Sequence, residues 1–256
     1  MISEKLENIE LSNFPVAIFG SGPAGITTAL ELEKKNIKSL IIEAGEENYS
    51  EVSQEFYKAK IIGDQITDLS SSRLRQFGGT SGHWGGWSKP MENYNLEDWP
   101  LKINSLDSYS KKASKILSIN NQFRKSSLNN FFNQIEFQYS TVRFADKFKE
   151  HIKNSNKILL ILNTQLSHFA GSNNKTEYAI CLSNESIKKK ITAKYFILAC
   201  GGIENSRILL WTREKNNKFI NSDLPIGKYW MNHPWILGGA GLINKKKLKK
   251  KWEIIF

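Results

Sequence analysis

The chain of 256 residues lacks the features that mark membrane-spanning, secreted and metal-binding proteins. No apolar run approaches the roughly 18 residues that a membrane-spanning helix needs. Cys181 and Cys200 are the only cysteines and show no metal-ligand spacing, which argues against a disulfide framework and a metal site. Residues 1–13 carry acidic side chains where a secretory signal would have a basic start and an apolar stretch. We therefore expect a cytoplasmic protein that holds no metal and does not associate with a membrane.

Arginine is scarce as well, although the chain is strongly basic. The net charge is +11, and of the 36 lysine and arginine residues only six are arginine, at positions 73, 75, 124, 143, 207 and 213. Arginine is the residue favoured for bidentate recognition of phosphates and bases. The lysines are instead spread along the chain, apart from the run KKKLKKKW at Lys245–Trp252. This distribution indicates a solvated basic surface, so we expect no nucleic-acid partner.

Residues 14–42 contain the pattern of a strand, a helix and a second strand. The segment FPVAIF, Phe14–Phe19, is a short apolar run of the kind found in strands buried on both faces. Pro23–Lys35 shows helical spacing, and a second apolar run follows at Ser39–Ile42. Such a unit joins two parallel strands through a right-handed crossover. The chain is therefore predicted to have an α/β fold.

The remainder of the chain contains further helix and strand patterns. Helices are predicted at Leu106–Leu117, Ala145–Ile152 and Ile203–Trp211. Strands are predicted at Lys157–Leu162, Gln165–Ala170, Glu177–Leu182 and Ile191–Ala199. Residues 119–139 are rich in Asn, Gln, Ser and Phe and give no assignment.

The turn between the first strand and its helix is a G-x-G-x-x-G sequence, GSGPAG, at Gly20–Gly25. In this motif the first glycine permits the tight turn, the second lets the backbone approach a pyrophosphate, and the third lets the helix pack closely on the strand. The helix N-terminus directs unpaired N–H groups at the phosphates. Glu43, at the end of the second strand, can accept the ribose hydroxyls, and an acid there disfavours the 2′-phosphate of NADP. The unit predicts an adenine dinucleotide and leaves FAD and NAD open.

A second glycine-rich stretch, FGGTSGHWG, lies at Phe77–Gly85. Its glycines permit positive φ or a close approach of the backbone to a ligand. Thr80, Ser81, His83 and Trp84 add groups that can donate hydrogen bonds, react or stack. Taken alone, the stretch predicts either a functional loop or a plain glycine-rich turn.

Five segments in order resemble the glucose–methanol–choline (GMC) oxidoreductases, over residues 14–235. The segments are VAIFGSGPAG with IIEAG behind it, FGGTSGHWGG, EDWPLKINSLDSYSKKASKIL, AKYFILACGGIENSRILL and LPIGKYWMNHP. The second is similar to the family's flavin-attachment loop, and the fifth is similar to its "HP" segment. The resemblance favours FAD over NAD and makes a NAD-linked dehydrogenase the weaker alternative.

The resemblance implies FAD, bound covalently or non-covalently, and an alcohol or sugar hydroxyl as substrate. It also implies a Rossmann-like FAD-binding domain of three layers, of the ββα type, with part of a second domain that shapes the substrate pocket. The FAD-binding domain would comprise residues 1–90 and 140–212, and the substrate or cap domain residues 91–139 and 213–256. The cofactor-binding residues that it implies are Gly20, Gly22, Pro23, Ala24, Gly25, Glu43, Ala44, Gly79, Ser81, His83, Ala199 and Gly201.

His83 is the most specific of these predictions. Some family members link the flavin ring covalently to a histidine at this position, and a neutral imidazole is a competent nucleophile. The alternative is a histidine that only hydrogen-bonds the cofactor or the loop. Both interpretations stay open at the level of the sequence.

The family's catalytic base is a histidine in a late segment, and residues 235–256 contain no histidine. His151 and His168 lie in polar surroundings and are expected on the surface, and His233 is expected to be structural. We therefore expect either a truncated or split gene product or a chain whose missing part, base included, is supplied by a second polypeptide. Truncation is favoured, and an electron acceptor is another possible partner. The basic run at 245–252 fits truncation better than a tail for anionic membranes or acidic partners. A catalytically silent flavin-binding module is the main alternative function.

Overall fold

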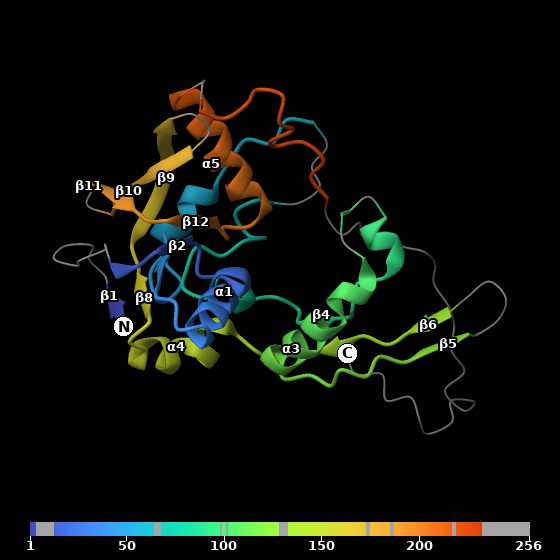
Figure 1. Ribbon diagram of the computed structural model, residues 1–256. Helices are drawn as coiled ribbons and strands as arrows, with labels where there is room; N and C mark the ends of the chain where they lie inside the picture. The colour runs from blue at the N-terminus through green and yellow to red at the C-terminus, as the bar shows by residue number, and fades with distance from the viewer. Residues whose placement is uncertain are drawn as a thin grey trace.

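The computed structural model describes residues 1–3, 13–63, 68–97, 99–100, 102–127, 133–172, 175–184, 187–216 and 219–231. A five-stranded parallel sheet forms its centre, with the strand order β1-β8-β3-β2-β12 (Figure 1). The inner strands β2, β3 and β8 are buried along their whole length, which is why the sequence shows them as uninterrupted apolar runs. The strands are β1 Ile2–Ser3, β2 Val16–Phe19, β3 Ser39–Ile42, β8 Ile158–Ile161 and β12 Tyr195–Leu198.

Two helices cover one face of this sheet (Figure 1). Helix α1, Pro23–Lys34, connects β2 to β3, and its proline stands at the helix start, where no N–H is needed. Helix α4, Phe144–Asn154, leads into β8. Ile18 and Ile41 of the strands pack with side chains of both helices in a single core cluster. No helix in the described ranges is long and apolar enough to cross a bilayer.

The opposite face of the parallel sheet is covered by a second sheet and by helix α5. This sheet is antiparallel, with the order β11-β10-β9, and its side chains share a core cluster with Phe19 and Ile42. Its strands and the helix are β9 Thr164–Ser172, β10 Lys175–Ser183, β11 Lys188–Thr192 and α5 Gly202–Lys215. The molecule therefore has three layers, with the parallel sheet in the middle, and its fold is Rossmann-like, as the sequence predicted.

The prediction of a single strand at Ile191–Ala199 is wrong, because the chain forms parts of two strands there. Strand β11 ends at Thr192 in the antiparallel sheet, and β12 begins at Tyr195 in the parallel sheet. At the break, the N–H groups of Lys194 and Tyr195 both donate to Pro15 O, at 2.9 and 3.0 Å. An apolar run cannot reveal such a change of partner, since both strands bury side chains in the same core.

The helix and strands between Trp87 and Tyr139 that the structure describes lie to one side of the central sheet (Figure 1). Two small antiparallel pairs occur here, β4 with β7 and β5 with β6, beside helix α3. Part of the stretch 119–139, which the sequence left unassigned, therefore forms strands. The elements of this region are β4 Trp87–Ser88, α3 Asp107–Leu117, β5 Lys125–Ser127, β6 Asn133–Ile135 and β7 Gln138–Tyr139, with short 3-10 turns η4 Asn93–Leu96 and η5 Ile103–Leu106.

Candidate functional site

The G-x-G-x-x-G turn joins the end of β2 to the start of α1. Gly20 has φ +100°, and a Cβ atom there would lie 2.5 Å from Ala199 O on the neighbouring strand. A Cβ atom at Gly25 would lie 1.9 Å from Gly20 O, so only glycine lets the helix approach the turn this closely. The first N–H groups of α1 have no carbonyl partner within the helix, and Gly22, Pro23 and Ala24 line a cavity at this end. The turn is therefore suited to bind an anion.

Glu43 follows β3 and is almost fully buried beside this turn. Its Oε2 accepts hydrogen bonds from Ser21 N at 2.9 Å and Ser21 Oγ at 2.7 Å, and its Oε1 accepts one from Gly45 N at 2.9 Å. A carboxylate oxygen can accept two hydrogen bonds, so Oε1 keeps one acceptor position. Since Glu43 lines the cavity, that position is available to a ligand hydroxyl.

The second glycine-rich stretch packs directly against the first. It contains the 3-10 turn η3, Gly79–Gly82, and Gly78 N donates to Ser21 Oγ at 3.2 Å. A Cβ atom at Gly79 would lie 3.1 Å from Gly22 Cα, so the two backbones are in contact. The hydroxyl of Ser21 thus connects both glycine loops and Glu43.

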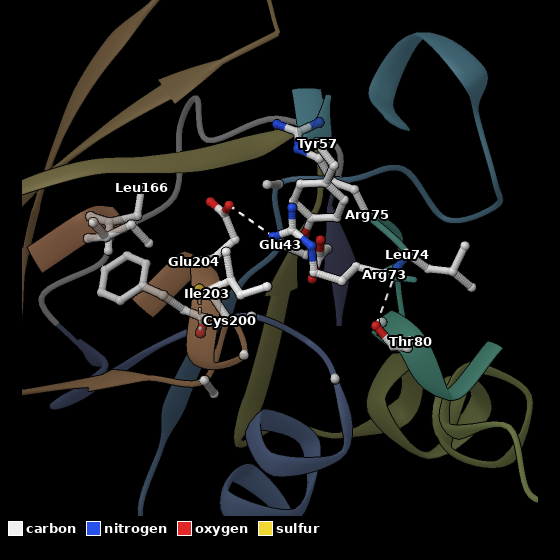
Figure 2. Close-up of a pocket in the computed structure, with 18 of the residues that line it drawn as sticks. Glu43, Tyr57, Arg73, Leu74, Arg75, Thr80, Leu166, Cys200, Ile203 and Glu204 are labelled. Carbon is white, nitrogen blue, oxygen red and sulfur yellow. Dashed lines mark hydrogen bonds and ion pairs between the residues drawn. The ribbon is translucent and has the colours of Figure 1, made fainter. Parts of the chain in front are cut away.

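Most of the predicted cofactor-binding residues line one cavity of about 480 Å³ (Figure 2). They are Gly20, Gly22, Pro23, Ala24, Glu43, Ala44, Gly79, Ala199 and Gly201. Gly25, Ser81 and His83 are not among the lining residues. Gly25 instead packs on the turn behind the cavity, as described above.

Ser81 and His83, which the resemblance assigns to the cofactor, do not line this cavity. Ser81 is buried, donates to Gly78 O at 2.7 Å and accepts from Phe144 N, at the start of α4, at 3.1 Å. Its hydroxyl therefore fixes the loop to the helix. His83 is exposed at the end of η3. Thr80 lines the cavity in their place and accepts a hydrogen bond from Leu74 N.

The described histidines do not line this cavity. His151 on α4 is exposed and pairs with Glu33, and His168 on β9 forms a hydrogen bond with its neighbour Ser167. The surface position predicted for His151 is confirmed, and His168 is partly buried. His233 and the basic run at 245–252 lie outside the described residues.

The sequence did not anticipate the polar and aromatic side chains at the far end of the cavity. Figure 2 shows Thr80 and Leu74 on one side of Glu43, and Leu166, Cys200 and Glu204 on the other. Three of the chain's six arginines line this cavity, a concentration that their scarcity in the sequence could have suggested. The additional polar and aromatic lining residues are Phe56, Tyr57, Arg73, Arg75, Thr164, Gln165, Glu204, Arg207 and Trp230.

Glu204, in the first turn of α5, holds two of these arginines. Its Oε1 lies 3.1 Å from Arg73 Nη1, and its Oε2 lies 2.7 Å from Arg207 Nε. The guanidinium carbon of Arg73 is also 4.0 Å from the ring centroid of Tyr57, which lies in the 3-10 turn η2, Glu55–Tyr57. Burial raises the pKa of Tyr57, and the charges of Glu43 and Glu204 raise it further, so its hydroxyl stays protonated.

Arg75 is buried and has no carboxylate partner among the ion pairs of the described residues. Its Nη1 donates to Ser53 Oγ at 2.7 Å and its Nη2 to Gln165 Oε1 at 3.2 Å. Burial lowers the pKa of Arg75, and the charge of Glu43 opposes that effect, but an arginine remains charged at neutral pH. The far end of the cavity is thus both cationic and aromatic.

Together, these features define one site in a Rossmann-like fold. One end offers glycine backbone and a helix N-terminus for phosphates, the middle offers a carboxylate for hydroxyls, and the far end offers planar cations and rings. Such an order suits a dinucleotide, whose phosphates, ribose and base follow one another.

Comparison with known proteins gives matches only at the level of structure. No protein-family model and no curated protein matches the sequence. A fungal aryl-alcohol oxidase is 12% identical with a TM-score of 0.55, and the match covers 77% of this chain and 47% of that one. An FAD-dependent oxidoreductase from Chaetomium thermophilum is 12% identical with a TM-score of 0.54 and the same coverage, 77% and 47%. Pyridoxine 4-oxidase from Mesorbium loti is 13% identical with a TM-score of 0.49, covering 76% and 50%.

The chain therefore spans about half the length of these solved structures. At such identities the likeness concerns the fold. It agrees with the parallel sheet and the three-layer arrangement described above.

Proposed function

We propose that this chain is the cofactor-binding part of an FAD-dependent oxidoreductase of the GMC type, which oxidises CH–OH groups of an alcohol or a sugar. The observation that carries the proposal is that two glycine loops and Glu43 meet at one cavity. Ser21 of the first loop is hydrogen-bonded to Glu43 and to Gly78 of the second loop. The fold it shares with the aryl-alcohol oxidase and the Chaetomium oxidoreductase supports the same conclusion.

The residues of the cavity fit FAD. The N-terminus of α1 with Gly20 and Gly22 would hold the pyrophosphate, and the remaining acceptor position of Glu43 Oε1 would take a ribose hydroxyl. When bound, FAD supplies the acceptor for the hydride that leaves the substrate carbon. The protein's own part in this region is to bind and orient that cofactor.

We also propose a division of labour within the chain. Residues 1–90 and 140–212 would form the FAD-binding domain, and residues 91–139 and 213–256 would belong to the substrate domain. The position of α3 and β4 to β7 beside the central sheet supports this division (Figure 1). The base that takes the hydroxyl proton would come from another segment or from a second polypeptide, since histidines 83, 151 and 168 do not line the cavity.

Titration of the purified full chain with FAD, followed by flavin fluorescence, tests the proposal. We expect FAD to bind, and we expect Glu43→Gln to weaken it roughly tenfold or more, because a hydrogen bond from the ribose to a charged acceptor is lost. Glu51→Gln is the matched control, because Glu51 is an exposed acid that does not line the cavity. Absence of FAD binding, or preferential binding of NAD, would overturn the proposal.

Bleaching of the bound flavin by substrate separates an enzyme from a silent binding module. The FAD-loaded protein is incubated without oxygen with a panel of simple alcohols and sugars. Its absorbance is then recorded near 450 nm, which is roughly the absorption maximum of the oxidised flavin. Loss of the yellow colour supports oxidation of CH–OH groups. Colour that persists with every compound favours the silent module or a fragment that needs the polypeptide carrying the base.

The attachment of the flavin to His83 stays a prediction, and the exposure of this histidine favours non-covalent binding. Acid precipitation of FAD-loaded protein should therefore release the flavin into the supernatant. Flavin that stays with the protein, and is released in His83→Ala, would establish the covalent link instead.

A further inference from the structure

The far end of the cavity lies where the base of a dinucleotide would be. If the phosphates bind at α1 and the ribose at Glu43, the base must lie beyond Glu43, on the side of Leu166, Cys200 and Glu204 (Figure 2). This inference rests on the proposed function, because it uses the order of groups in a dinucleotide. The question is which side chains at that end would contact a planar base.

Phe56 stands out at this position. It lies in the 3-10 turn η2, lines the cavity and keeps 44% of its surface exposed, although it is a large apolar ring. The guanidinium carbon of Arg75 is 4.8 Å from its ring centroid, and that of Arg207 is 5.2 Å away. Two planar cations therefore contact one aromatic ring inside the cavity.

Both arginines are fixed from behind. Ser53 and Gln165 accept hydrogen bonds from Arg75, and Glu204 pairs with Arg207. Both Nη groups of Arg75 and Nε of Arg207 are engaged in this way, and the guanidinium groups contribute flat surfaces to the cavity as well as charge. Phe56, Arg75 and Arg207 thus form one wall of the cavity, made of an aromatic ring and two guanidinium groups over it.

A nucleobase matches such a wall better than other ligand groups do. Aromatic rings and guanidinium planes both stack on the π-face of a base. A phosphate would use the arginines but gain nothing from the ring, and an aliphatic chain would use the ring but gain nothing from the guanidinium groups. The exposed surface of Phe56 is then the part that a bound base would cover.

We propose that Phe56 positions the base of the dinucleotide and thereby selects FAD over flavins that lack an adenosine, such as FMN. Its ring and the guanidinium groups of Arg75 and Arg207 form one wall of the base site. Phe56 acts in binding and orientation only, so its contribution appears with any ligand that carries the adenosine end.

Binding of FAD, ADP and FMN to three variants of the full chain tests this role. Phe56→Leu keeps an apolar side chain but removes the ring, and Phe56→Tyr keeps the ring. Val52→Ala is the matched control, because Val52 lies on the adjacent helix α2, Glu51–Gln54, is exposed and does not line the cavity. Circular dichroism and thermal unfolding verify that each variant is folded.

We expect Phe56→Leu to weaken FAD and ADP roughly tenfold, because base–ring stacking is lost, and to leave FMN affinity unchanged. Phe56→Tyr and Val52→Ala should bind all three ligands as the original chain does. If Phe56→Leu binds FAD and ADP normally, or weakens FMN equally, the role assigned to Phe56 is wrong. If Phe56→Leu does not fold, a fourth variant, Phe56→Ala, takes its place. Normal adenosine binding by Phe56→Ala, or loss of it in Phe56→Tyr, contradicts the role equally well.

The two proposals fail in different ways. If the original chain binds ADP but neither FAD nor FMN, the proposed flavin function is wrong, and the ADP measurements still decide the role of Phe56. If it binds FAD and the Phe56 variants do not differ, the function stands and the base-site assignment falls.

Discussion

Ser21 Oγ donates a hydrogen bond to Glu43 Oε2 at 2.7 Å and accepts one from Gly78 N at 3.2 Å. This hydroxyl is fully buried and connects the two glycine loops through one atom. It also orients the carboxylate that faces the cavity. The sequence motif counts Ser21 only as a variable position between two glycines, yet in the structure it determines how the loops meet.

Replacing Ser21 with alanine should therefore affect both stability and binding. The change leaves Gly78 N buried without its acceptor, so we expect a loss of about 1–3 kcal/mol in the free energy of unfolding. FAD affinity should fall as well, because Glu43 loses one of the groups that orient it. Urea unfolding and FAD titration measure the two effects. Ser222→Ala, at an exposed serine, should change neither, and a Ser21→Ala protein that matches it would contradict the linking role.

The parts of the site that the sequence revealed are those encoded locally. Gly20, Gly22 and Glu43 could be found because a glycine spacing and a short apolar strand specify a turn and its neighbouring carboxylate within about 30 residues of chain. The parallel sheet followed from the same local patterns.

The parts that the sequence did not reveal depend on distant contacts. Arg73 and Glu204 are separated by 131 positions, and only the packing of α5 beside the glycine loops brings them together. Ser81 was assigned to the cofactor by resemblance, whereas its hydroxyl is bonded to Gly78 and Phe144. The division of residues 191–199 between two sheets likewise depends on which strands lie nearby.

Gly25→Ala should destabilise the fold by about 2–3 kcal/mol, because the added methyl group would overlap Gly20 O at 1.9 Å and only a backbone shift could relieve it. Gly202→Ala is the matched control, since no atom lies within 4 Å of its Cβ position and the residue begins helix α5. There, alanine should be neutral or slightly stabilising. Chemical unfolding of both proteins decides the matter, and equal midpoints would show that the turn tolerates a Cβ atom.

Glu204→Gln should lower the free energy of unfolding by about 3 kcal/mol, because Arg73 and Arg207 lose their shared, largely buried counter-charge. Glu31→Gln removes an exposed partner of Lys34 and should cost less than about 0.5 kcal/mol. The comparison is made by urea unfolding in the same buffer. A Glu204→Gln protein as stable as Glu31→Gln would mean that solvent already compensates the two arginines.

Cys200 lines the cavity, and its thiol should react with alkylating reagents unusually slowly at neutral pH. Burial, with the nearby charges of Glu43 and Glu204, raises the pKa of Cys200 to about 12. At pH 8 only about one thiol in ten thousand is then ionised, compared with about a quarter for an ordinary cysteine. The rate of carbamidomethylation by iodoacetamide should rise about tenfold for each pH unit between 7 and 9.5, because the thiolate fraction is still far from saturation. Mass spectrometry of the modified peptide gives the rate, and Cys200→Ser identifies the signal against Cys181, which is fully buried. A rate that already bends away from this slope near pH 8.5, which is about the pKa of a free thiol, would show that the Cys200 thiol is not shielded in the way the structure indicates.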